Sequence, residues 1–151
     1  MDNDAVTPAR KLSQLYAYTS IRMHEAVARK AGLSGTDHKY LGFLLQKGPM
    51  TAGELSGLTG LTTGAITGLI DRFEKKKLVK RTLAADDRRK VIIVPDTRNI
   101  MALLEPLYKE YRNKSEQLLA SFSRKELKVI ETYFSKAIEI MNETTNELNN
   151  Q

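Results

Sequence analysis

The side chains best suited to chemistry in this sequence are basic, and they are concentrated in one short stretch. Residues 72–90 contain nine lysines and arginines against three acidic residues, so this stretch alone carries a charge equal to the net charge of +6 of the whole chain. A localised basic stretch is typical of surfaces that bind polyanions. The alternative is a solvated surface that only keeps the protein soluble, and composition leaves both interpretations open.

Other kinds of chemistry lack the residues that they need. The sequence has no cysteine and two histidines, so we expect no disulfide, no thiolate metal site, no bound metal and no cofactor. It has no glycine-rich phosphate loop, nucleophile elbow or convergent pair of carboxylates, which argues against an enzyme. The polar first residues and the short aliphatic runs predict neither a secretory signal nor a membrane span, and therefore a cytoplasmic protein.

The elements that must position the basic stretch are mainly helices. Apolar residues at three- and four-residue steps predict one helix from Thr7-Pro8 to Gly32 and another from Thr36 to Gln46. A capping box, Thr51 to Glu54, opens a short helix that ends near Gly60. The next helix begins at Thr62 or Thr63, and its core-facing stripe is Ile66, Leu69, Ile70 and Phe73. Two helices joined by so short a turn indicate a helix-turn-helix.

A change of period follows this pair of helices. Residues 78–83 and 90–94 are rich in β-branched side chains and flank the polar segment 84–89, which predicts a β-hairpin with a charged tip. A hairpin in this position is called a wing. The sequence therefore predicts a mostly α-helical fold with a small β-hairpin wing, in which residues 36–95 form a winged helix-turn-helix domain.

Both ends of the chain are expected to be helical and to pair with a second copy. A second capping box, Ser123 to Glu126, opens a helix whose apolar residues step through three heptads. We predict that residues 1–35 and 96–151 form a dimerisation region, with the alternative that this seam packs only within its own chain. Residues 142–151 are polar and are expected to fray.

The second helix of the helix-turn-helix begins with small residues that would allow close approach to DNA. Thr62, Thr63, Gly64, Ala65 and Thr67 lie in its first turns, and threonine can give thymine both a hydrogen bond and a methyl contact. Thr62 could instead serve only as a helix cap. Arg72, two turns further along, is expected to reach a phosphate, with a surface ion pair to Glu74 or to the neighbours of Asp71 as the alternative.

Residues 10–148 resemble the MarR family of bacterial transcription regulators. The most specific match runs from the helix at residues 62–74 through Leu78-Val79-Lys80-Arg81 to Asp87-Arg88-Arg89 at the tip of the hairpin. The segment Val94-Pro95-Asp96 departs from the family pattern, although Asp96 can still cap the helix that follows.

The resemblance implies a homodimer that binds a pseudo-palindromic operator, commonly as a repressor. It also implies that Asp87 orients Arg89 and that Arg89 enters a narrow minor groove, where negative potential is concentrated. Arg88 and Lys90 are then expected to contact phosphates. Arg81 would support the wing by pairing with the wing-tip acid, or would meet an anionic ligand.

Many members of the family release DNA when a small phenolic or anionic effector binds near the junction of the two regions. A pocket built from the first, second and fifth helices would include the polar-tipped aromatic side chains Tyr16, His24, His38 and Tyr40, although each of them could equally be a half-buried packing residue. The alternative function is a winged-helix module for protein contact or for non-specific nucleic-acid binding.

Overall fold

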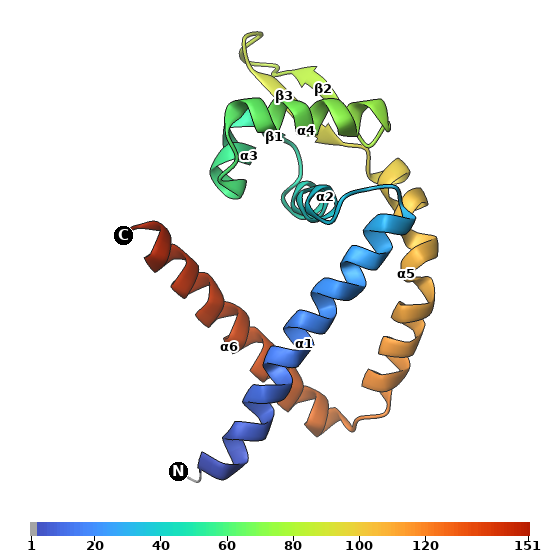
Figure 1. Cartoon of the computed structure of the whole chain (residues 1–151), viewed down its shortest axis with the longest axis vertical. Helices are drawn as coiled ribbons and strands as arrows, with labels where there is room; N and C mark the ends of the chain where they lie inside the picture. The colour runs from blue at the N-terminus through green and yellow to red at the C-terminus, as the bar shows by residue number, and fades with distance from the viewer. Residues whose placement is uncertain (1–2) are drawn as a thin grey trace. The chain divides into compact units, whose positions relative to one another are not determined.

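The computed structural model describes residues 3–151, which form helices and one small sheet (Figure 1). The contacts between its residues divide the chain into two compact units, the first ending at Tyr108 and the second beginning at Lys109. In the described part of the chain, no helix is both long and apolar enough to cross a membrane. The elements in chain order are α1 (Asn3–Lys30), α2 (Gly35–Lys47), β1 (Met50–Thr51), α3 (Ala52–Thr59), α4 (Thr63–Lys75), β2 (Val79–Leu83), β3 (Val91–Pro95), α5 (Thr97–Ala120) and α6 (Arg124–Asn149).

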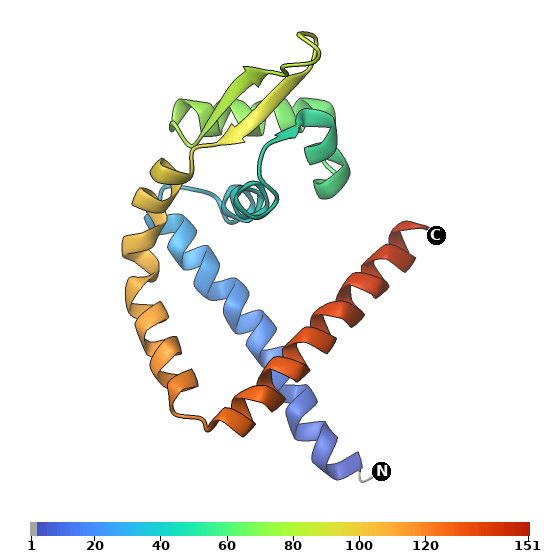
Figure 2. The same ribbon diagram turned by 180° about the vertical axis from the view of Figure 1, so that it is seen from behind.

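The predicted hairpin is confirmed, and it belongs to a three-stranded antiparallel sheet in the order β1-β3-β2. Arg81 of β2 lies opposite Ile93 of β3, and the two strands project as a wing beyond α4 (Figure 2). The strand β1 was not predicted. It consists of Met50 and Thr51, which pair with Ile93 and Ile92. A two-residue strand has no period of its own, so only its distant partner reveals it.

The core confirms the stripe expected on the second helix of the helix-turn-helix. Ile66, Leu69, Ile70 and Phe73 of α4 are all buried. They belong to one cluster to which every helix of the first unit and strands β1, β2 and β3 contribute, including Leu41, Leu44, Leu55, Ile93 and Ile100. This cluster holds α4 at a fixed orientation under the wing, with its opposite face turned outward.

Side chains that cap helices set most of the helix boundaries. Both predicted capping boxes are present: Thr51 with Glu54 at the start of α3, and Ser123 with Glu126 at the start of α6. Asp96 accepts a hydrogen bond from the backbone N of Asn99 at 3.0 Å, so the expected cap of α5 is confirmed. Such caps satisfy backbone N–H groups that the helix itself leaves unpaired.

Two expected boundaries are wrong. Helix α1 begins by Asn3, and Pro8 lies inside it. Proline has a helical φ, and so near a helix start its missing N–H removes only a bond to the first turn. At the other end α6 continues to Asn149 instead of fraying from residue 142; Thr144 and Thr145 donate hydroxyl hydrogen bonds to the carbonyl oxygens of Ile140 and Met141.

Candidate nucleic-acid interface

The start of α4 presents a surface of small, exposed side chains. Thr62 is the N-cap, and its hydroxyl oxygen accepts from the backbone N of Ala65 at 3.2 Å, so its capping role is real. Thr67 donates its hydroxyl to the carbonyl oxygen of Thr63 at 3.0 Å. That bond fixes the donor proton, and Thr67 then offers its oxygen lone pairs and its methyl group outward. Thr63, Gly64 and Ala65 are exposed as well, and this helix face is open to a partner.

The wing tip exposes an arginine that an acid steadies. The Asp87 carboxylate accepts from the backbone N of Arg89 at 2.9 Å and lies 3.5 Å from its Nε atom. The side chain of Arg89 is nevertheless 95% exposed. Arg88 and Lys90 beside it are also exposed. The pairing of Asp87 with Arg89 agrees with the expected orienting role, while the groove contact stays a prediction.

Arg81 joins the wing to α4 rather than to the wing tip. Its Nη2 atom lies 2.6 Å from Asp71 and its Nη1 atom 2.8 Å from Glu74, both on α4. The hydrogen bond to Asp71 is the main cause that raises the pKa of Arg81 above its ordinary value, so the guanidinium stays charged. The expected pairing of Arg81 with the wing-tip acid is therefore wrong, because Arg81 bonds the two acids of α4 and Asp87 bonds Arg89. The two acids lie on either side of Arg72 and Phe73 in the sequence, but only the fold shows that β2 runs beside them.

Arg72 has a partner that sequence reasoning missed. Its Nε and Nη2 atoms donate to the two carboxylate oxygens of Asp37 on α2, at 2.8 and 2.9 Å. The expected ion-pair alternative, Glu74, bonds Arg81 instead. The hydrogen bonds to Asp37 raise the pKa of the Arg72 guanidinium above its ordinary value. Asp37 is the buried acid of the first turn of α2, and no sequence signal linked it to a residue thirty-five positions away.

Two of the four predicted effector residues come together, and a third residue joins them. The hydroxyl of Tyr108 on α5 lies 2.6 Å from Nδ1 of His24 on α1 and 3.0 Å from Nε2 of His38 on α2. Burial and the neighbouring His24 lower the pKa of His38. Tyr108 was missed, although it lies one helical turn beyond Leu104 in the apolar stripe of α5.

The other two predicted effector residues lie elsewhere. Tyr40 is buried in the core beside Phe43, on a helix that packs against α1 and β3. Tyr16 lies on the exposed part of α1, two turns before His24. Within residues 3–151 no group of three or more histidine, aspartate or glutamate side chains is placed to hold a metal ion.

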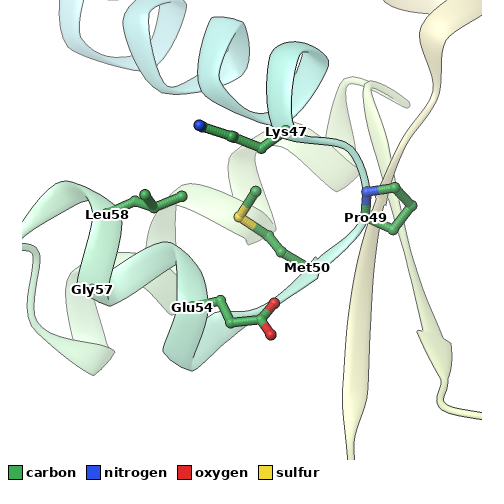
Figure 3. Close-up of a pocket in the computed structure, with 6 residues that line it drawn as sticks. All are labelled: Lys47, Pro49, Met50, Glu54, Gly57 and Leu58. Carbon is green, nitrogen blue, oxygen red and sulfur yellow. The ribbon is translucent and has the colours of Figure 1, made fainter. Parts of the chain in front are cut away.

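The pocket drawn in Figure 3 lies between the end of α2, β1 and α3. The carboxylate of Glu54 in its wall already accepts from the backbone N of Thr51. No predicted effector residue lines this pocket, so it is separate from the cluster around Tyr108. Its lining residues are Lys47, Pro49, Met50, Glu54, Gly57 and Leu58.

Comparisons with known proteins agree with this geometry. A model of the MarR family matches residues 31–90. The HTH-type transcriptional regulator YcgE of Bacillus subtilis is 36% identical over 148 residues, covering 98% of this chain and 93% of that protein. A MarR family protein from Bacillus stearothermophilus superposes with a TM-score of 0.71 at 25% identity, over 94% of this chain and 99% of that one.

A MepR variant from S. aureus, solved bound to an oligodeoxyribonucleotide, shares the fold with a TM-score of 0.53 at 22% identity, covering 86% of this chain and 97% of that one. Relationships of this extent over nearly the whole chain show more than a shared helix-turn-helix. The chain belongs to the MarR family, and it is a transcription regulator with a DNA-binding winged helix-turn-helix fold rather than an enzyme.

Proposed function

We propose that this regulator is a repressor that acts in the bacterial cytoplasm, binds a pseudo-palindromic operator as a homodimer and leaves it when a small phenolic or anionic molecule binds. One observation carries the proposal. The exposed, threonine-lined start of α4 and the 95% exposed Arg89 of the wing belong to the same packed unit. The start of α4 comes shortly before the most basic stretch of the chain, residues 72–90, and Arg89 lies within that stretch. A small-sided helix suits a major groove, and an exposed guanidinium suits an adjacent minor groove.

Each residue of this surface receives a role. Thr63 and Thr67 contact base edges, while Thr62, Gly64 and Ala65 allow the helix backbone to come close. Arg89 enters the minor groove, steadied by Asp87. The phosphate contacts come from Arg72, Arg88 and Lys90, and Arg81 supports the wing through α4. The DNA-bound MepR variant supports this use of the fold.

The dimer is proposed from apolar surface that a single chain leaves bare. All residues of α6 are described, and none is buried. Its exposed apolar side chains include Val129, Tyr133, Phe134, Ile138 and Met141. The first half of α1 likewise exposes Leu12, Leu15 and Tyr18. Burying such faces is strongly favourable, so residues 1–35 and 96–151 are assigned to dimerisation and residues 36–95 to DNA binding.

The effector is proposed to bind at the cluster of His24, His38 and Tyr108. The two imidazoles converge on one hydroxyl oxygen. A phenol could take the place of that hydroxyl and donate or accept the same hydrogen bonds, and an anionic oxygen could accept them from the imidazole N–H groups. Because α1, α2 and α5 each supply one of these side chains, a ligand there would act on the packing of all three helices at once.

The test is selection of bound duplexes from a random-sequence library, followed by measurement of mass and salt dependence in solution. We expect a dimer, one recovered palindrome, and a loss of about 10³–10⁵ in affinity between ~50 and ~200 mM salt for roughly 6–10 phosphate contacts. A chain that stays monomeric, or that binds all duplexes equally, would point instead to protein contact or non-specific binding and would overturn the proposal.

A further inference from the structure

The ion pair between α2 and α4 joins Asp37 and Arg72, and the two side chains differ in how far they are exposed to solvent. The side chain of Asp37 is 12% exposed, whereas that of Arg72 is 55% exposed. Both oxygens of Asp37 bond to one edge of the guanidinium, at Nε and Nη2. A carboxylate held in this way fixes both the position and the plane of the arginine.

The rest of the guanidinium is directed toward the start of α4. A guanidinium has five N–H donors, so the two bonds to Asp37 leave three of them unused by that partner. Nη1 lies over Gly68, one turn earlier on the helix, where a β-carbon would be 3.5 Å away. Gly64 lies one turn earlier again, so this row of α4 carries no side chain between Arg72 and the exposed helix start.

From this geometry we propose that Asp37 is a positioning residue for DNA binding, which holds Arg72 so that its remaining N–H donors clamp a backbone phosphate beside the start of α4. This inference rests on the proposed function, because it names how one of the phosphate contacts is made. Asp37 touches no DNA in this arrangement. It acts through Arg72, as Asp87 acts through Arg89 in the wing.

The proposal predicts an effect whose sign opposes that of simple electrostatics. Asp37 is an acid near a surface that binds a polyanion, so loss of its charge alone should strengthen DNA binding. A positioning role demands the reverse. An asparagine in its place would keep at most one acceptor for the guanidinium, and Arg72 would then have to be ordered when DNA binds, which costs side-chain entropy.

The decisive experiment measures the affinity of Asp37→Asn for the duplex that the unmodified dimer selects, over a series of salt concentrations. We expect roughly tenfold weaker binding, and a salt slope that is shallower by about two, because each protomer loses one phosphate contact worth ~0.9 in slope. A merely structural role of the ion pair would lower the melting temperature but leave that slope unchanged, and unchanged or tighter binding overturns the proposal.

A double-mutant cycle assigns the effect to Arg72. In the Arg72→Gln background, Asp37→Asn should weaken binding no further, whereas a second loss of equal size would show that Asp37 acts by another route. Should Asp37→Asn fail to fold, Arg72→Lys gives the same test. Lysine keeps the charge but lacks the planar fork, so the affinity and the slope should both fall, and retention of both overturns the clamp.

The matched control is Asp86→Asn, which removes the same charge from an exposed acid of the wing tip. This variant should bind the selected duplex as well as the parent or better, and an equal loss in both variants overturns the assignment to Asp37. Failure of the parent to select any duplex would contradict the proposed function itself. The two failures are therefore distinguishable.

Discussion

The winged region and the last helix are both amphipathic, but only the winged region covers its own apolar side chains. Phe73 of α4 has an exposed fraction of 0%, and its neighbours on the same stripe are nearly as buried. On α6, Phe134 is 45% exposed and Ile138 is 53% exposed, although their spacing is just as regular. The same pattern of residues thus produces a buried core in the winged region and an exposed apolar face on α6.

The difference teaches which properties belong to one chain and which require two. The cluster around Phe73 forms between segments of the first unit, so α4 and the wing are positioned whether or not a partner is present. A bare face on α6 favours association, because burying apolar area releases about 25 cal/mol per Å². The positions of α4 and the wing are thus set within one chain, whereas in the proposed dimer the distance between the two copies of this surface would be set by how the chains pair.

The largest effect is expected from charging the bare face of α6. Phe134→Asp places a carboxylate where the second copy should pack, and twofold symmetry places its counterpart at the same interface, so a buried charge and like-charge repulsion both oppose association. We expect a monomer whose affinity for the palindromic duplex falls by about a thousandfold or more, since one half-site is lost. Light scattering and duplex titration measure the two quantities.

The control for this variant lies next to it in the sequence. Ser135→Asp adds the same charge at an exposed position on another side of α6. This variant should remain dimeric and keep its affinity for the duplex. A Phe134→Asp protein that is equally dimeric would mean that this face is not the interface.

The next effect concerns the region that is complete in one chain. Phe73→Ala removes a fully buried ring, and we expect the free energy of unfolding to fall by roughly 3–5 kcal/mol. Denaturant unfolding at two protein concentrations should show the same loss at both, because the cavity lies within one protomer. A loss that grows on dilution would contradict the division into a self-sufficient winged region and a partner-dependent helix.

The sequence predicts the parts of this fold whose causes are local. Both capping boxes join residues three positions apart, and the stripe of α4 repeats within four turns, so type and spacing were enough. The strand β1, the bond from Asp37 to Arg72, the pairing of Arg81 with Asp71 and the place of Tyr108 all join distant segments. Charge shows that such side chains need partners, but only the tertiary fold brings one particular partner into hydrogen-bonding distance.

A third kind of surface, charged rather than apolar, is tested at the wing tip. Arg89→Ala should weaken binding to the selected duplex by about 1–3 kcal/mol for each wing, because a guanidinium leaves a groove of high negative potential. The dimer and its melting temperature should not change, since the side chain is almost wholly exposed. Arg124→Ala at the start of α6 removes the same charge and should leave duplex affinity intact. Parent-like affinity of Arg89→Ala would show that the wing does not enter the groove.

The smallest effect tests where along α1 the buried core ends and the exposed apolar surface begins. Val27 and Ala28 are in the core, Ile21 is exposed, and His24 lies between them against His38. Because burial and His24 lower the pKa of His38, the unfolded chain binds this proton more readily than the folded one. The free energy of unfolding should therefore fall as the pH drops below the ordinary histidine value of about 6.5, until His38 is protonated in the folded state too.

Replacing His38 with glutamine tests this border, because the amide can still bond Tyr108 but cannot titrate. The decline in stability below pH ~6.5 should then become shallower, because position 38 no longer takes up a proton on unfolding. The chain has only two histidines, so in His24→Gln the single remaining imidazole signal reports His38 by NMR. Its pKa should rise toward the ordinary value without reaching it, since the charge of His24 is gone and the burial is not. A full return would mean that the α1–α2–α5 junction is open to water in solution, and the border of the self-covered region would then lie nearer to Val27.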